Sequence, residues 1–277
     1  MQQTMIWPED HRSAAMISVE LDAEFIWLGM DPDNIRLPKT LSMGEYGMHR
    51  GLDRLLSVFD KYDVKATFFV LGEAFDRYGS VIEKLAKAGH EIAVHGFQHV
   101  NFGLLSPENQ REQIEKTILQ IEKHIGVKPV GFRVPEGNMT PETLEIAKEL
   151  GLCYDSSLMD SDLPYMIGNG KAKGLVEIPM RWDMQDFHYF CFNFHPEVPP
   201  GVCRIANYVQ VQSLWQDELD AFHDYGLCYV IKFDPQSIGT PGRIDIVESL
   251  IKSMREKKMW IATGRQIAEH TINMQQL

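Results

Sequence analysis

Residues 89–99 read GHEIAVHGFQH, a short apolar run that ends in two histidines four positions apart, His95 and His99. The apolar run is typical of a buried strand. Two imidazoles at this spacing just past a strand can bind one metal ion if the turn between them is tightly coiled. The pair alone is weak support, because histidines at this spacing are more often unrelated surface and core residues.

An anionic partner for the two histidines stands at the end of another apolar run. Residues 16–24 read MISVELDAE, and Asp22 follows the apolar part of that run. A strand-end aspartate and two histidines would leave coordination positions open for water and substrate, which distinguishes a catalytic from a structural metal site. Asp22, His95 and His99 are therefore candidate metal ligands.

Composition excludes several classes of partner. The chain has 277 residues, 44% of them hydrophobic, which is enough for the core of one barrel domain. Its formal net charge of −12 argues against nucleic acid and against anionic membranes as partners.

Cysteine usage and the first residues favour the cytoplasm. The cysteines lack C-x-x-C spacing, and we expect free thiols in a reducing compartment. Residues 1–13 show neither a basic nor an apolar signal region, so we expect no signal peptide, and no apolar run is long enough to cross a membrane. The cysteines are Cys153, Cys191, Cys203 and Cys228.

Apolar runs alternate with helix-like segments along the rest of the chain, which favours a mainly parallel sheet with crossover helices. At this length we expect a (β/α) barrel of about seven strands, and no glycine-rich nucleotide motif argues for another fold. Residues 23–47 are expected to form one long functional loop. The expected strands are 16–22, 64–71, 89–94, 130–134, 153–155, 175–178, 227–233 and 260–263. The expected helices are 50–62, 76–88, 107–125, 141–150, 210–225 and 243–256.

Unusual polar residues follow several of the expected strands. The carboxyl ends of strands are where barrel enzymes build their active sites, so this common placement predicts one site. The residues are Glu20, Asp22, His95, His99, Arg133, Asp155 and Asp234.

At these positions the chain resembles the polysaccharide deacetylase family, also called the NodB-homology domain or carbohydrate esterase family four. The family's two acids beside a strand correspond to Glu20 and Asp22, and its His-x-x-x-His motif to His95 and His99. Its Arg-x-Pro-x-Gly motif corresponds to residues 133–137, RVPEG. The resemblance is good over about residues 14–160 and looser beyond. It implies a distorted barrel as a single catalytic domain, 1–277, a divalent metal on Asp22, His95 and His99, and hydrolysis of an amide C–N bond.

Within that family, SMGEYG at 42–47 and YDSSL at 154–158 are similar to a cytoplasmic branch. That branch includes allantoinase-like and cyclic-imide hydrolases and peptidoglycan deacetylases. The resemblance implies zinc, with cobalt or another divalent ion as alternatives. The allantoinase-like members are described as metal-independent, so activity without a metal stays open.

The resemblance also assigns roles. Glu20 occupies the position of the catalytic base, where the family usually has aspartate. We expect Arg133 to orient a carboxylate such as Glu20 by a bidentate contact. We expect Glu45 and Tyr46, in the long first loop, and Asp155 to contact substrate.

Asp234 departs from the family pattern, which places a general-acid histidine after the apolar strand 229–233. Asp234 takes that role with a raised pKa, or another histidine does, or the activity is altered. Three functions follow: metal-dependent N-deacetylation of a carbohydrate, ring opening of a cyclic imide or ureide, and sugar binding by a pseudoenzyme. We expect a small-molecule or carbohydrate amide as substrate and a homo-oligomeric protein.

Overall fold

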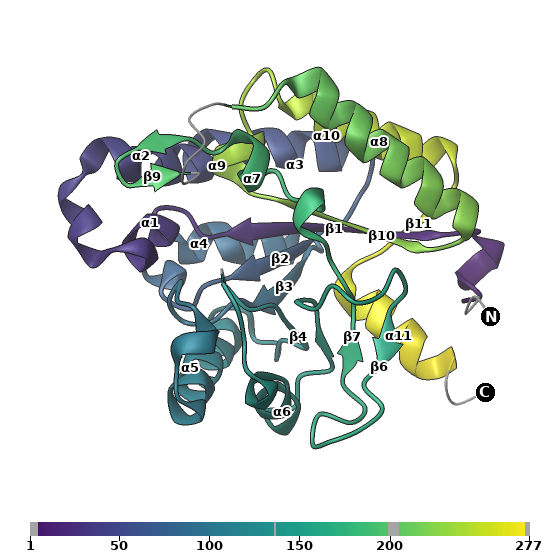
Figure 1. Cartoon of the computed structure of the whole chain (residues 1–277), viewed down its shortest axis with the longest axis horizontal. Helices are drawn as coiled ribbons and strands as arrows, with labels where there is room; N and C mark the ends of the chain where they lie inside the picture. Colours follow the sequence, from purple (N-terminus) through teal and green to yellow (C-terminus); the bar gives the residue numbers. More distant parts are fainter. Residues whose placement is uncertain (1–4, 136, 199–204, 275–277) are drawn as a thin grey trace.

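A mostly parallel sheet runs through the molecule in the computed structural model, which describes residues 5–135, 137–198 and 205–274 (Figure 1). The strands are β1 Ala14–Leu21, β2 Thr67–Val70, β3 Glu91–Val94, β4 Gly131–Phe132, β5 Tyr154–Asp155, β6 Tyr165–Met166, β7 Val176–Glu177, β8 Asn193–Phe194, β9 Glu197–Val198, β10 Cys228–Phe233 and β11 Trp260–Ile261. The main sheet has the order β10-β1-β2-β3-β4-β5-β7-β6, and β11 also pairs with β1. Among the described strands, only β6 and β7 pair antiparallel in this sheet, and β8 and β9 form a separate hairpin.

Helices cover the outside of this curled sheet. In Figure 1, α3, α8 and α10 lie above β1 and β10, whereas α5 and α6 lie below β2 to β4. Helix α4 contacts β3 and α5. The helices are α1 Phe25–Met30, α2 Pro38–Tyr46, α3 Leu52–Lys61, α4 Ala74–Lys87, α5 Pro107–Ile125, α6 Pro141–Glu149, α7 Phe187–Phe190, α8 Tyr208–Tyr225, α9 Pro235–Ile238, α10 Ile244–Glu256 and α11 Gly264–Met274. Short 3-10 or π segments are η1 Pro8–Asp10, η2 Pro32–Arg36, η3 Gly47–Gly51, η4 Phe102–Leu104 and η5 Trp182–Met184.

Strand β1 explains how the sheet separates its core from its site. Successive side chains of a strand point to opposite faces. The odd-numbered residues 15–21 pack into the apolar layer beneath the helices. The even-numbered Ala14 and Met16 face the barrel interior with Phe69 and Val230. Continuing the same alternation puts polar side chains inside the barrel only near the carboxyl end of the strand.

The barrel is closed by a helix on one side. Within the described ranges, no strand pairing joins β10 or β11 to β6 or β7. Helix α11 contacts β5, β6 and β7 instead, and its buried Ile267 and Ala268 join the interior cluster. The predicted distorted (β/α) barrel is therefore confirmed, as a curled half-barrel whose gap is filled by α11.

The prediction of one long loop over residues 23–47 is wrong, because this segment holds α1, η2 and α2. Its prolines and glycines suggest a loop, but Pro32 and Pro38 stand at the first turns of η2 and α2, where a missing N–H costs little. Gly44 allows α2 to pack directly on the backbone of Ala23, since a Cβ there would lie 2.3 Å from a carbonyl carbon.

The other predicted helices and strands are confirmed, and most strands are shorter than predicted, although β1 begins two residues earlier. Helix α5 begins after Ser106, whose side chain accepts a hydrogen bond from Asn109 N–H, and ends before Gly126 at φ 79°. The short α9, strand β6 and the whole of α11 were not predicted. Only Ala262 and Thr263 separate α11 from β11.

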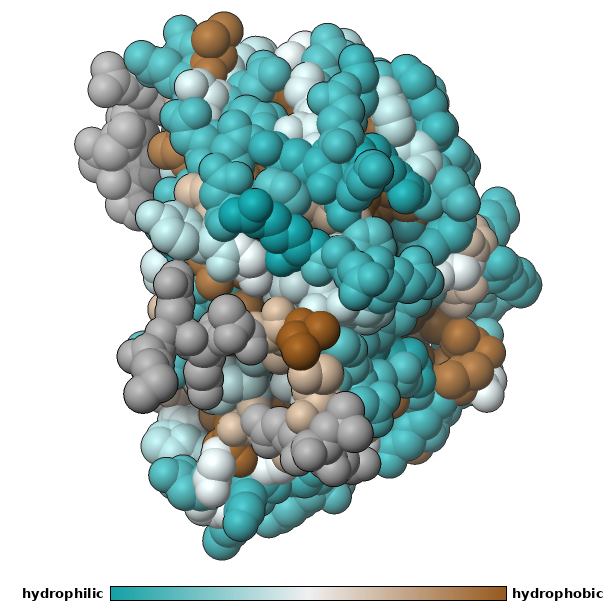
Figure 2. All heavy atoms as spheres, turned by 90° about the vertical axis from the view of Figure 1, so that its right-hand side faces the viewer, coloured by the Kyte–Doolittle hydropathy of each residue, from teal (hydrophilic) through white to brown (hydrophobic). Residues whose placement is uncertain are grey.

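The surface on the side of the chain ends is mostly hydrophilic, with isolated hydrophobic side chains (Figure 2). In the described part of the chain, no helix is long and apolar enough to span a membrane. Cys153 and Cys228 are free thiols as predicted, and Cys203 lies outside the described residues.

Because α11 closes the barrel, truncating its buried side chain should destabilise the whole fold. We expect Ile267→Ala to lower the free energy of unfolding by about 2–5 kcal/mol in urea titrations, through lost burial and a cavity. Glu269→Ala, on the exposed face of the same helix, should stay within about 0.5 kcal/mol of wild type. Equal midpoints for the two variants would show that α11 is not part of the cooperative core.

Candidate active site

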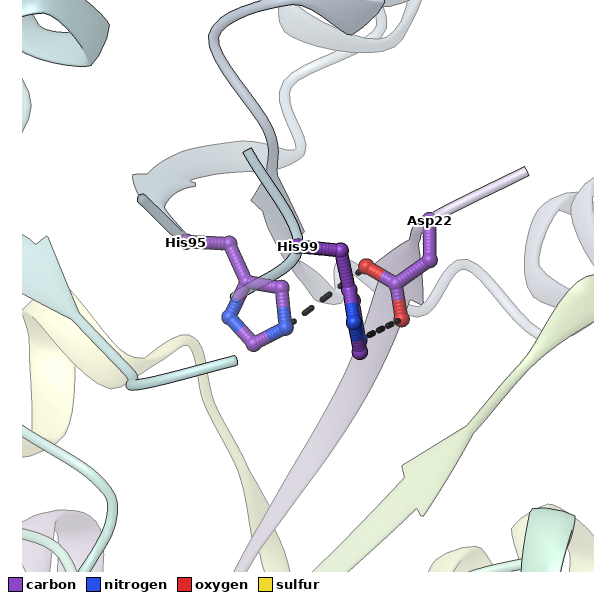
Figure 3. Close-up of side chains that lie close together, drawn as sticks. All are labelled: Asp22, His95 and His99. Carbon is purple, nitrogen blue, oxygen red and sulfur yellow. Dashed lines mark ion pairs between the residues drawn. The ribbon is translucent and has the colours of Figure 1, made fainter. Parts of the chain in front are cut away.

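Three side chains converge at the carboxyl ends of β1 and β3. Asp22 follows β1, and His95 and His99 follow β3. Figure 3 shows both imidazoles beside the Asp22 carboxylate, with His95 Nε2 3.6 Å from Oδ1 and His99 Nε2 3.6 Å from Oδ2. One potential ligand atom from each residue lies within 4.8 Å of the others. The three predicted ligands are thus brought together from two strands.

The turn after β3 returns the chain toward Asp22. Gly96 has φ 81°, a left-handed conformation that favours glycine, and it separates His95 from the residues that lead to His99. His95 is anchored on both sides, because its N–H donates to the Val70 carbonyl and its Nδ1 lies 2.9 Å from the Arg133 carbonyl. A carbonyl can only accept, so Nδ1 carries the proton and Nε2 presents a lone pair toward Asp22.

Two of these ligand atoms have no hydrogen-bond partner. Among the described residues, His95 Nε2 and Asp22 Oδ1 are buried from solvent and accept no hydrogen bond. Burial lowers the pKa of His95, so its imidazole is neutral at neutral pH, the form that binds metals. Burial alone would raise the pKa of Asp22, but His99 and His95 outweigh it and lower this pKa to about 2. A neutral histidine and an ionised carboxylate with unused lone pairs fit a divalent cation.

Glu20 lies beside this set and is held by two cations. Its Oε2 is 3.7 Å from His95 Nε2 and also contacts Lys232 Nζ, while its Oε1 is 3.4 Å from Arg133 Nη1. Burial would raise the pKa of Glu20, but Lys232 and His95 lower it overall. Glu20 is therefore an ionised carboxylate next to the candidate ligands, as a general base requires.

Lys232 was missed by the sequence analysis. It lies on β10 opposite Ser18 of β1, only 13% of its side chain is exposed, and Glu20 and Asp22 raise its pKa against the effect of burial. Its signal in the sequence is a lysine inside the apolar run 228–233, at the same strand parity as Asp234. A charged residue on a buried strand needs a partner, and Glu20 is that partner.

The predicted bidentate contact between Arg133 and Glu20 is not found. Only Nη1 reaches Glu20, at 3.4 Å, and the same atom donates to Ser18 Oγ at 2.9 Å. Nε donates to the Ser156 carbonyl and Nη2 to Ser156 Oγ, each at 2.8 Å, and the guanidinium lies over the Phe69 ring. Arg133 thus divides its donors among Glu20, Ser18 and Ser156.

Asp234 lies at the carboxyl end of β10, where it caps α9. Its Oδ1 accepts from Gln236 N–H at 2.9 Å and its Oδ2 from Gln236 Nε2 at 3.2 Å. Burial, followed by the nearby Asp186, raises the pKa of Asp234 well above its ordinary value. The residue in contact with it is Asp186, whose Oδ1 accepts from Asp234 N–H.

Asp186 is a second residue that the sequence did not indicate, since no strand pattern precedes it. Burial, partly opposed by Lys232, raises its pKa to about 7. Four carboxyl groups therefore lie with two permanent cations at this end of the barrel interior. The carboxyl groups belong to Glu20, Asp22, Asp186 and Asp234, and the cations to Lys232 and Arg133.

The predicted substrate contact of Asp155 is not supported by its position. Its side chain is fully buried and accepts from the N–H and Oγ of Ser157, both at 2.9 Å. Ser157 Oγ in turn accepts from Val134 N–H, so Asp155 holds the loop after Arg133 in place. The buried Glu177 lies against the same turn and receives the N–H of Ser157.

Two small hollows flank the ligands. One, of about 60 Å³, is lined by Glu20, Arg133 and Lys232 and by the half-exposed Trp182. The other, of about 230 Å³, lies beside His99.

Glu45 and Tyr46, which we predicted to contact substrate, lie on α2 and line neither of these two hollows. Glu45 pairs with Arg77 at 2.6 Å, and Tyr46 Oη accepts a hydrogen bond from Arg54.

Comparison with known proteins gives a consistent result. The polysaccharide deacetylase family model matches residues 43–154. A crystal structure of a protein assigned as a polysaccharide deacetylase from Mycobacterium smegmatis is 34% identical, with a TM-score of 0.91, and the match covers 99% of this chain and 94% of that one. A peptidoglycan deacetylase from Helicobacter pylori is 25% identical over 91% of this chain and 93% of its own length. The fold is also shared with an allantoinase, at 22% identity and a TM-score of 0.81, over 98% and 93% of the two chains.

The ligand geometry predicts metal binding that depends on His95. Loaded with zinc or cobalt and freed of excess ion, the wild type should retain about one equivalent, measured by elemental analysis. His95→Ala should lose most of it, because two remaining ligands hold a metal poorly. His49→Ala, which removes an exposed histidine on η3, should behave as wild type. Retention below ~0.1 equivalent by the wild type would contradict the ligand assignment.

Proposed function

The chain belongs to the polysaccharide deacetylase family of hydrolases, which act on carbon–nitrogen amide bonds, and we propose that it is a single-domain, metal-dependent enzyme that removes an N-acetyl group from a carbohydrate. The observation that carries this proposal is that an ionised Glu20 contacts His95, whose Nε2, like Asp22 Oδ1, lacks a hydrogen bond among the described residues. Glu20 Oε2 is 3.7 Å from His95 Nε2.

Asp22, His95 and His99 would hold the cation. When bound, a divalent ion polarises a carbonyl group and lowers the pKa of nearby water. Glu20 accepts a proton from the attacking water, and Lys232 keeps its carboxylate ionised before that transfer. Arg133 fixes the position of Glu20 by bonding it and Ser156 at once.

The leaving nitrogen needs a proton, and two groups could supply it. Asp234 stands where the family has its histidine, and burial favours its protonated form. The alternative is His188 on α7, whose ring lies 5.3 Å from the Trp182 ring at the wall of the hollow that Glu20 lines. Burial and Lys232 lower the pKa of His188.

A second candidate function is ring opening of a cyclic imide or ureide. The hollow beside Glu20 has only about 60 Å³, which suits a small ring better than a sugar chain. An imide or ureide nitrogen also leaves with little protonation, which suits a site with aspartate in place of the family's histidine.

We further propose zinc as the ion, a cytoplasmic location and a homo-oligomeric state. Zinc suits a site with two imidazoles and one carboxylate. The free thiols of Cys153 and Cys228 support a reducing compartment. The net charge of −12 supports a small or uncharged substrate rather than nucleic acid or an anionic membrane.

A two-substrate panel separates the candidate functions. We expect the metal-loaded wild type to release acetate from an acetylated chito-oligosaccharide, and Glu20→Gln, which keeps the shape of the side chain, to lose roughly 10²-fold or more in kcat. Ring opening of hydantoin without acetate release would favour the second function. Sugar binding without turnover of either compound would instead indicate a pseudoenzyme.

The proton donor can be identified by two substitutions. We expect Asp234→Asn to lower kcat by roughly 10²-fold on an amide substrate, because asparagine still caps α9 but cannot donate the proton. His188→Gln should then retain most of the activity. The opposite pattern would assign the proton to His188, and no loss in either variant would mean that the leaving nitrogen needs no acid.

A further inference from the structure

A further cavity, of about 420 Å³, lies among α2, α7 and α9, away from the candidate metal-ligand atoms. We call it the arginine cavity, because Arg243 is the one permanently charged residue among its described lining residues. Its walls include Met43, Tyr46, Phe190 and Phe192. No aspartate or glutamate lines it in the described part of the chain. The cavity thus combines an apolar body with a single cation.

Arg243 is buried without an acidic partner. It is only 7% exposed, and its hydrogen bonds go to neutral oxygens: Nε to Tyr208 Oη at 3.1 Å and Nη1 to the Ser237 carbonyl at 2.7 Å. The guanidinium also lies 4.9 Å from the centre of the Phe190 ring. No ion pair of Arg243 is found among the described residues, and residues 199–204, PPGVCR, contain no acid in sequence.

The guanidinium retains unused donors toward the cavity. It has five N–H groups, and the described structure gives hydrogen-bond acceptors only for Nε and Nη1. Nη2 has no hydrogen-bond acceptor among the described residues, and Arg243 lines the cavity. A buried cation is costly unless an anion pairs with it, and a planar guanidinium edge matches a carboxylate.

We propose that the arginine cavity binds a small carboxylate with an apolar body, with the carboxylate on the Nη2 edge of Arg243 and the apolar part against Phe190, Phe192 and Met43. A carboxylate is favoured over phosphate, because one cation and aromatic walls suit a monoanion with an apolar group.

The cavity shares a wall with the candidate active site. Gln236 lines the cavity, and its Nε2 donates to Asp234 Oδ2 and to the carbonyl of Ala23, which follows Asp22. Trp27 Nε1 donates to Gln236 Oε1 and fixes the side chain between the two. A ligand in the cavity is therefore separated from the metal ligands by this side chain and does not need them for binding.

Benzoate is a suitable probe, with benzamide as its neutral counterpart of the same shape. We expect isothermal titration of the full-length chain to show one saturable benzoate site, and benzamide to bind roughly tenfold more weakly or worse, because it lacks the charge-assisted pair. Arg243→Gln should weaken benzoate binding by a similar factor. No saturable binding at about 10 mM benzoate, or equal affinity for the two compounds, would overturn the proposal.

A second variant keeps the test valid if Arg243→Gln fails to fold. Ser42 lies at the exposed rim of the cavity on α2, and Ser42→Trp should block benzoate while leaving the guanidinium in place. Its control is Ser57→Trp on α3, because Ser57 is also exposed and also donates to a carbonyl of its own helix. Benzoate affinity unchanged by Ser42→Trp would contradict the assignment.

The metal-ligand variant distinguishes this site from the proposed catalytic one. His95→Ala should bind benzoate with wild-type affinity, since His95 does not line the arginine cavity. Loss of benzoate binding in His95→Ala together with its retention in Ser42→Trp would place the carboxylate at the metal ligands and overturn the proposal. A failed deacetylation assay leaves this result untouched, because the titration measures binding and not turnover.

Discussion

A buried ion pair between Glu20 and Lys232 is the interaction on which the candidate site depends. Both groups leave water when β1 and β10 pair, and either one alone would be a buried charge without compensation. Strand register places Lys232 opposite Ser18, and Ser18 is the inward-facing residue of β1 just before Glu20. Pairing of the two strands therefore also brings Lys232 next to Glu20. Arg133 reaches the same carboxylate from the end of β4. Three segments far apart in sequence are thereby fixed by one charge.

The alternation of side chains along the strands confines the chemistry to one interior face. Glu20, His95, Lys232 and Asp234 all stand at inward positions, and the intervening outward positions are apolar and support the helices. At the carboxyl ends the polar inward residues lie close enough to interact. At the amino ends, Thr67, Glu91 and Tyr154 form a separate hydrogen-bonded group. Burial, with a smaller contribution from neighbouring carboxylates, raises the pKa values of Asp186 and Asp234, whereas neighbouring imidazoles lower that of Asp22.

The sequence was sufficient to predict which side chains converge where each of them followed a recognisable strand. Asp22, His95 and His99 converge as predicted, since parallel strands bring their carboxyl ends to one edge. Asp186 follows the short segment η5 and has no strand pattern before it, so only the folded chain reveals it beside Asp234. The prediction of a loop over residues 23–47 was wrong for a different reason, because proline and glycine occur in loops, at helix starts and at close packing contacts alike. Asp155 shows that a strand-end acid can support a loop instead of facing substrate.

The place of β1 in the sheet has a consequence for the order of folding. Its neighbours are β2 on one side and β10 and β11 on the other, and Ala14 pairs with both Cys228 and Trp260. During synthesis residues 14–21 leave the ribosome long before residues 228–261, so this side of the sheet stays incomplete until nearly all of the described chain has been made. Contacts of such large sequence separation slow folding. Until then one edge of an apolar strand is exposed, and a nascent chain of this design benefits from chaperone protection.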